Sequence, residues 1–342
     1  MSEKLLLLSF SAFIVSVRLT QFSCDDIQVS SYVLKTYGLK TTIKTFSSTF
    51  NTPFEKSTIH VFNATIPILC CRVFNFSHEL EVLEFDNCNI KHIESCFSEK
   101  VQHVTGTIKI TNNRITVIEK DTFRNLNLLQ IILLKNSIAI IEDGAFANLP
   151  NLVSITLSQN HLSTINSNGF AYLPVLNIID LSLNRITHLD RGDFGFCQAT
   201  LVTIFLECNE ISNIDGAFDG MLSTSLSLYL AGNRIEHLSG TIFNGHKFSQ
   251  VDLRFNHLDE VSVEFCSRNC TIGSFYFECS LTSMEAAQNL VKWAEENEVQ
   301  LVSGPCSYLN VTFVSMPWDG CKAGGSLSGY ESLVGVLLIV CS

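Results

Sequence analysis

Histidine is the residue type here best suited to acid–base chemistry, and it recurs in the middle of the chain at His161, His188, His237 and His257. A general base needs one unique setting. Each of these histidines instead repeats at an equivalent place in a recurring segment, which indicates a solvated polar position. The G-x-S-x-G, H-E-x-x-H and phosphate-loop patterns are absent from the sequence. We therefore predict no catalytic residue, no cofactor and no enzymatic activity.

Cysteine is the second reactive type, with 13 copies. This usage indicates an oxidising compartment, and an odd count leaves at least one thiol unpaired or removed. Metal binding is the alternative for the C-terminal cysteines, but no C-x-x-C pair is present, so we predict no metal site. The disulfide candidates are Cys70, Cys71, Cys88, Cys96, Cys266, Cys270, Cys279, Cys306 and Cys321.

The N-terminus predicts export. Lys4 precedes an apolar run over 5–17, which has the length of a signal-peptide core; a buried N-terminal strand is the alternative. Glycosylation triplets begin at Asn63, Asn75, Asn269 and Asn310, and none falls between residues 80 and 265. The protein is therefore expected outside the cell, either secreted or attached to the outer surface.

Charge excludes one class of partner. The net charge is −11 and only 16% of the residues are charged, with no cluster of Lys and Arg. Nucleic acids and anionic lipids both require such clusters. Neither is therefore expected as the main partner.

An internal repeat must position whatever chemistry the chain performs. The frame L-x-x-L-x-L-x-x-N-x-L recurs, with its asparagine at Asn113, Asn136, Asn160, Asn184, Asn209, Asn233 and Asn256. The steps between these asparagines are 23, 24, 24, 25, 24 and 23 residues. An eighth, imperfect copy at Leu80–Ile90 carries Cys88 at the asparagine position. This frame is the leucine-rich-repeat signature.

Each repeated residue has a physical role. Alternating apolar residues such as Ile131 and Leu133 mark a short strand with one buried face. The asparagine amide can bond backbone groups that would otherwise be buried unpaired. Phenylalanines such as Phe123 and Phe146 fill a layer beneath. Because one repeat cannot enclose a core, neighbouring repeats must stack. The predicted fold is an α/β solenoid: a leucine-rich-repeat horseshoe of about eight repeats with a parallel concave sheet and cysteine-containing caps at both ends.

The segments Phe123–Leu126, Phe146–Leu149 and Phe170–Leu173 share the pattern F-x-x-L, in which the sequence resembles the extracellular leucine-rich-repeat family. The opening Ala199–Ile204 is similar to secreted arthropod proteins typified by the non-catalytic subunit of a shrimp luciferase. The resemblance implies a binding protein, and it implies a C-terminal cap in which a helix with Trp293 lies between bridged Cys279 and Cys306. The usual Asn-Pro and Cys-x-Cys elements of that cap are missing.

The predicted organisation has five parts: a signal peptide over 1–23, an N-terminal cap over 24–79, repeats over 80–265, a C-terminal cap over 266–322 and a tail over 323–342. The tail consists of small residues, then a short spacer, then an apolar end. This arrangement resembles a glycosyl-phosphatidylinositol anchor signal. The alternative is that the tail forms a last strand or a short disordered end. Such an anchor is the one membrane attachment expected.

Strand residues between the buried ones should line the concave face, which is a common ligand surface of solenoids. The predicted central row is Glu84, Lys109, Ile132, Thr156, Asp180, Phe205, Tyr229 and Asp252. The candidate ligand-binding residues are the adjacent aromatics Phe205 and Tyr229, their polar neighbours Asp180, Glu207, Asp252 and Arg254, and a second apolar spot at Ile132 and Leu134. Cross-strand packing is the alternative role of the aromatic pair.

Three functions are consistent with the sequence. The favoured one is recognition of a protein or glycan partner through the concave face, in adhesion, as a co-receptor or in immune sensing. An accessory subunit that stabilises a secreted enzyme is the second, and a self-associating matrix component is the third.

Overall fold

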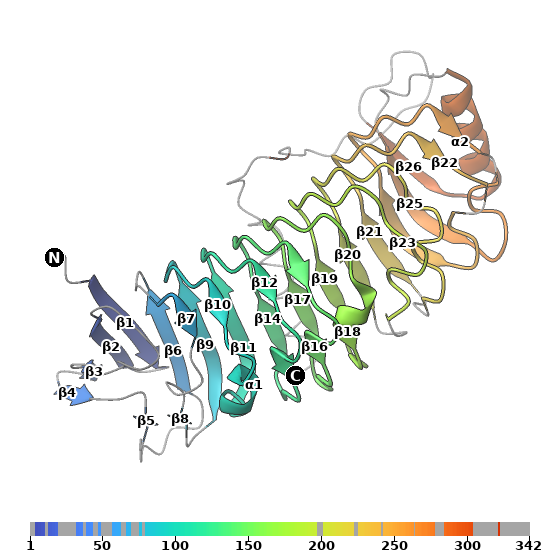
Figure 1. Ribbon diagram of the computed structural model, residues 1–342. Helices are drawn as coiled ribbons and strands as arrows, with labels where there is room; N and C mark the ends of the chain where they lie inside the picture. Colours follow the sequence, from blue (N-terminus) through green and yellow to red (C-terminus); the bar gives the residue numbers. More distant parts are fainter. Residues whose placement is uncertain are drawn as a thin grey trace.

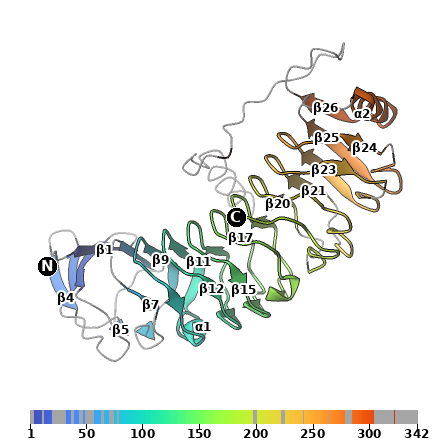
Figure 2. The same cartoon turned by 45° about the horizontal axis from the view of Figure 1, so that its top comes forward.

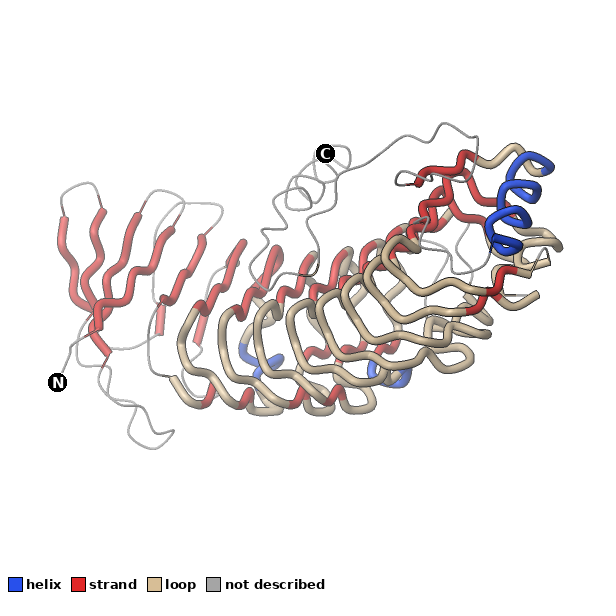
Figure 3. Tube along the Cα trace, turned by 90° about the horizontal axis from the view of Figure 1, so that it is seen from above, coloured by secondary structure: helices blue, strands red, loops and turns tan. Residues whose placement is uncertain are grey.

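The computed structural model of the protein describes residues 66–69, 79–196, 201–221, 225–240, 242–262, 264–277, 284–303 and 321, together with the backbone of the strands between Lys4 and Phe76. Its main feature is a curved solenoid in which successive turns of the chain stack side by side (Figures 1 and 2). The strands lie along one side of the solenoid and the loops along the other (Figure 3).

Eleven parallel strands form the principal sheet, each paired with the next along the chain. They are β6 (Ser57–Phe62), β9 (Leu80–Asp86), β11 (Val104–Thr111), β14 (Gln130–Ile132), β17 (Ser154–Thr156), β19 (Ile178–Asp180), β20 (Thr203–Phe205), β21 (Leu226–Tyr229), β23 (Lys247–Asp252), β25 (Thr271–Phe277) and β26 (Gln300–Ser303). The eight predicted repeats supply β9 to β23. The predicted solenoid with a parallel sheet is confirmed.

The sheet extends beyond the predicted repeats at both ends. Strand β6 precedes the first repeat, and β25 and β26 follow the last one. A sheet edge presents unpaired backbone groups, so these added strands continue the pairing past the limits of the repeat frame.

The side opposite the sheet consists of short strands and turns, with few helices. Parallel pairs form between β7 (Ile68–Leu69) and β10 (His92–Ile93), β12 (Val117–Ile118) and β15 (Ile140–Ile141), and β22 (His237–Leu238) and β24 (Glu260–Val261). A three-stranded strip joins β13 (Phe123–Arg124), β16 (Phe146–Ala147) and β18 (Phe170–Ala171). The helical turns α1 (Phe97–Lys100) and η2 (Ser167–Gly169) lie between these strands in the sequence.

The repeat asparagines follow one another from turn to turn as a ladder, and all seven are at least 93% buried. In Asn160, the amide nitrogen donates to the carbonyls of Leu133 and Leu157, each at 2.9 Å. Its side-chain oxygen accepts the backbone N–H of Ile138 at 3.0 Å. One side chain thus bonds three buried backbone groups from two turns, which explains why the position requires an amide.

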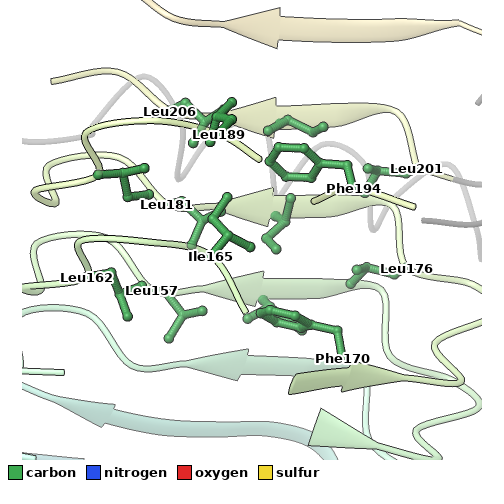
Figure 4. Close-up of a cluster of buried hydrophobic side chains, with 14 of the residues drawn as sticks. Leu157, Leu162, Ile165, Phe170, Leu176, Leu181, Leu189, Phe194, Leu201 and Leu206 are labelled. Carbon is green, nitrogen blue, oxygen red and sulfur yellow. The ribbon is translucent and has the colours of Figure 1, made fainter. Parts of the chain in front are cut away.

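Two apolar layers fill the solenoid. Leu157, Leu181 and Leu206 from successive turns lie one above another, while Phe170 and Phe194 belong to a separate layer (Figure 4). The rings of Phe123 and Phe146 stack with centroids 5.3 Å apart. Phe170 stacks on Phe196 at 4.7 Å, so an additional ring enters the predicted series at that turn.

The C-terminal end is covered by α2 (Met284–Glu296), which contains Trp293 and lies between Cys279 and Cys306, where the resemblance implies a helix. Leu290, Trp293 and Ala294 are buried, whereas Val291 is half-buried. The indole of Trp293 lies 4.5 Å from the ring of Phe265, which belongs to the last repeat. The phenylalanine layer therefore ends against α2 and is not exposed to solvent.

The N-terminal strands form a separate antiparallel sheet of β1 (Lys4–Phe10), β2 (Phe13–Leu19), β3 (Tyr32–Thr36) and β4 (Leu39–Ile43). A two-stranded pair joins β5 (Ser47–Ser48) to β8 (Asn75–Phe76). The strands β1 and β2 cover the predicted signal peptide, but the folded form of this segment does not test whether it is cleaved during export. Export therefore stays a prediction. Within the described residues, no helix is both long and apolar enough to span a bilayer.

Candidate ligand-binding surface

The predicted central row of the concave face lies in register across the sheet. Asp180 pairs with Phe205, Phe205 with Tyr229, and Tyr229 with Asp252. The row continues to Tyr276 of β25, which pairs with Asp252. Sequence reasoning missed Tyr276 because the repeat frame ends before β25, although extending the row by one strand could have found it.

Phe205 and Tyr229 lie side by side, as predicted. Their ring centroids are 4.8 Å apart and the ring planes differ by 18°. Both side chains are half-buried, and the amide of Gln250 donates to the Tyr229 hydroxyl. Because the rings face each other along the solenoid axis, they direct their edges away from the sheet.

Asp252 and Arg254 form a buried ion pair beside these rings. The Nη2 of Arg254 lies 2.7 Å from the Oδ2 of Asp252, and the side chains are 14% and 6% exposed, respectively. The guanidinium also lies over the ring of Tyr276, 5.5 Å from its centroid. The two charges therefore compensate each other and fix the side-chain geometry of this part of the surface.

Asp180 lies beside Phe205 in the predicted row, but its side chain is buried and not exposed on the concave face. Its side-chain oxygen accepts the hydroxyl of Ser182 at 2.6 Å and the backbone N–H of Ser182 at 3.0 Å. Burial raises the pKa of the Asp180 carboxyl above its ordinary value, and the bonds from Ser182 offset part of this shift.

The phenol of Tyr229 is held in its neutral form. Burial, followed by the negative charges of its surroundings, raises the pKa of the Tyr229 hydroxyl to about 12. These charges include the half-buried Glu207, which follows the neighbouring strand β20. The hydroxyl therefore keeps its proton at neutral pH.

The second predicted apolar spot lies on the earlier strands. Ile132 and Leu134 are both half-buried. Toward the N-terminus, the ammonium of Lys109 lies 2.8 Å from the carboxylate of Glu84. This cation, like Arg254, is thus paired with a carboxylate.

Two cysteines differ from the predicted disulfide candidates. Cys321 bonds to Cys208, which lies at the end of a concave strand and is absent from the predicted candidates. Cys88, a predicted candidate, is a buried thiol that donates to the carbonyl of Asp86 at 3.3 Å. It occupies the ladder position of the first repeat, which packs it inside the core.

Among the other candidates, Cys266 and Cys270 bond to each other and Cys96 is disulfide-bonded. Cys70, Cys71, Cys279 and Cys306 lie outside the described residues.

Of the glycosylation candidates, Asn269 is exposed and has a left-handed backbone (φ 49°) beside the Cys266–Cys270 bond. Asn75 belongs to β8. Asn63 and Asn310 lie outside the described residues. Within the part of the chain that the structure describes, no group of three or more His, Cys, Asp or Glu side chains could hold a metal ion.

Comparison with known proteins places leucine-rich repeats in the middle of the chain. The leucine-rich-repeat family model matches residues 105–162, 131–186 and 150–200. A search of curated proteins finds no match.

Among solved structures, the chain is similar to one in the Toll–Spatzle complex of Drosophila, with 19% identity and a TM-score of 0.55 over 64% of this chain. The glycosylated form of that complex gives 18% identity and a TM-score of 0.57, also over 64% of this chain. The alignments span only 29% and 30% of those chains. The similarity confirms the leucine-rich-repeat horseshoe.

Proposed function

We propose that this protein is an extracellular recognition module that binds a protein partner through its concave face. The observation that carries this proposal is the stacked pair Phe205–Tyr229, half-buried in the central row of the sheet. Exposed aromatic clusters on a rigid scaffold are frequent anchors of protein interfaces. The sheet holds both rings in place before a partner arrives, so little side-chain freedom is lost on binding.

The orientation of the rings favours a protein over a glycan. A sugar stacks on an open aromatic face, whereas Phe205 and Tyr229 each have one face covered by the other ring at 4.8 Å. Ring edges and half-buried apolar side chains such as Ile132 suit contact with the side chains of another protein. The similar Drosophila chain also comes from a complex between two proteins, Toll and Spatzle.

The cysteine chemistry supports a location outside the cell. The bonds Cys208–Cys321 and Cys266–Cys270 are of a type that persists in oxidising compartments. Treating intact expressing cells with a phosphatidylinositol-specific phospholipase tests the predicted lipid anchor. Release of the protein from the surface supports the anchor, and protein already free in the medium argues against it.

A non-catalytic subunit of a secreted enzyme is the second candidate, favoured by the luciferase-like opening at Ala199–Ile204. Capture of extracellular proteins on the intact chain separates the two functions. A stoichiometric partner with catalytic activity supports the accessory role, and a partner without such activity supports recognition. The double variant Phe205→Ala/Tyr229→Ala should capture less of either partner, while Ile140→Ala, an exposed apolar site away from the concave sheet, should capture the same amount.

A further inference from the structure

An exposed apolar strip lies where the concave strands begin, outside the surface described above. Leu129 is 38% exposed, Val175 39%, Val202 40% and Tyr172 68%. These are four of the seven exposed large hydrophobic residues in the described part of the chain. Together with the half-buried Val153, they are called the lateral strip.

Backbone bonds make the lateral strip continuous across four turns. The N–H of Val153 donates to the carbonyl of Leu129 at 2.8 Å, and the N–H of Asn177 donates to the carbonyl of Val153 at 2.8 Å. The N–H of Val202 then donates to Asn177 at 2.9 Å. Adjacent strands are about 4.8 Å apart, so the strip is about 15 Å long. Tyr172 and Val175 widen it in the third turn.

The surroundings of the lateral strip carry no charge. The stretches 125–134, 147–158, 171–179 and 201–206 contain no Asp, Glu, Lys or Arg. Asparagines border the strip in bonded pairs, Asn127 with Asn151 at 2.5 Å and Asn125 with Asn148 at 2.7 Å. The glycosylation triplets also avoid this part of the chain. The result is an apolar centre with a neutral polar border, which is the organisation of a protein interface.

We propose that the lateral strip is the contact between two copies of this chain in a symmetric dimer. Each copy carries a net charge of −11 and therefore repels another copy across most orientations. That repulsion is weakest where two neutral faces meet. A twofold axis through the strip would place the Leu129 end of one copy against the Val202 end of the other, so that the same residues serve both sides.

This contact is separate from the proposed ligand surface. The strip residues Leu129 and Val202 directly precede the strands β14 and β20, whereas Phe205 and Tyr229 end the strands β20 and β21 in the central row. Dimerisation therefore leaves the aromatic pair available, and either proposal can fail without the other.

Sedimentation equilibrium of the purified full chain tests the proposal. The wild type is expected at twice the mass of one chain, and Leu129→Asp/Val202→Asp at the mass of one chain. The variant should keep cooperative thermal unfolding because both side chains are exposed. Ile140→Asp is the matched control, since Ile140 is 55% exposed outside the strip; it should remain dimeric. Phe205→Ala/Tyr229→Ala should also remain dimeric.

Two results would overturn the proposal. One is a wild type that sediments as a single chain at its highest soluble concentration. Hydrogen exchange would then show whether the chain's own C-terminal residues cover the lateral strip, and that result would also contradict the dimer. The other is a dimer that persists in Leu129→Asp/Val202→Asp.

Discussion

Cys208 and Cys321 are joined by a disulfide although 113 residues separate them in sequence, and their Cα atoms lie 5.4 Å apart. Cys208 directly follows Glu207, at the point where the chain leaves the concave face with a left-handed backbone (φ 57°). The bond therefore fixes residue 321 at the rim of the proposed ligand surface. It also closes a covalent ring around the last turns and α2.

The length of this ring predicts its contribution to stability. Loop-closure entropy gives about 5 kcal/mol for a bond across 113 residues and about 2 kcal/mol for Cys266–Cys270, which spans 4. Cys208→Ser/Cys321→Ser should therefore lower the free energy of unfolding in urea more than Cys266→Ser/Cys270→Ser does. Equal losses would show that the longer bond does not restrain the unfolded chain.

The asparagine ladder should be costly to interrupt. Asn160→Ala removes the partner of the Ile138 N–H and of two leucine carbonyls, all buried. Each buried group left unbonded costs about 1–3 kcal/mol, and three together should cost at least about 3 kcal/mol. Denaturant unfolding followed by circular dichroism measures this loss.

Asn151→Ala is the matched control for the ladder variant. Asn151 is exposed and bonds only the Asn127 side chain among the contacts seen. Its loss should cost less than about 1 kcal/mol. A similar cost at both positions would contradict the structural role assigned to Asn160.

Asp180 predicts a pH-dependent contribution to stability. Burial raises the pKa of this carboxyl in the folded protein above its unfolded value of 3.8. The folded state then binds the proton more tightly, so the contribution of Asp180 to stability is complete below about pH 4 and is lost as pH rises through the raised folded pKa. Asp180→Asn cannot ionise, so its unfolding free energy relative to wild type should increase over this window.

Urea unfolding of both proteins from pH 3 upward measures that difference. A constant difference between Asp180→Asn and wild type would mean that Asp180 is not desolvated by folding.

The buried pair Asp252–Arg254 should be sensitive to loss of one partner. Arg254→Met leaves the Asp252 carboxylate buried, with its side chain 6% exposed, and without its counter-ion. Such a loss typically costs about 3–5 kcal/mol. Asp252→Asn added to Arg254→Met should recover part of the stability in thermal unfolding, and no recovery would show that packing, not charge, sets the cost.

The repeat could be read from sequence because its positions are dictated locally. A ladder asparagine such as Asn160 and a stacked ring such as Phe146 recur at nearly fixed steps, so their register follows from counting. The same register predicts that Phe205 lies beside Tyr229, and the two rings stack in the structure.

Contacts that break the repeat could not be predicted in this way. Cys208 is an irregular residue at a loop position, and nothing local relates it to Cys321. Tyr276 lies in a strand that pairs with the sheet without carrying the repeat frame. The burial of Asp180 depends on side chains from adjacent turns, so its position in the frame alone did not distinguish a buried carboxylate from an exposed one.

The most direct test of the central claim is the affinity of the captured partner for immobilised wild type and for Phe205→Ala/Tyr229→Ala. Removing two anchor rings should weaken binding at least about 30-fold, since each hot-spot truncation costs at least about 1 kcal/mol. Thermal unfolding of the variant should shift little. Unchanged affinity would contradict the concave face as the binding surface, and equal losses of affinity and stability would assign the ring pair to packing of the sheet.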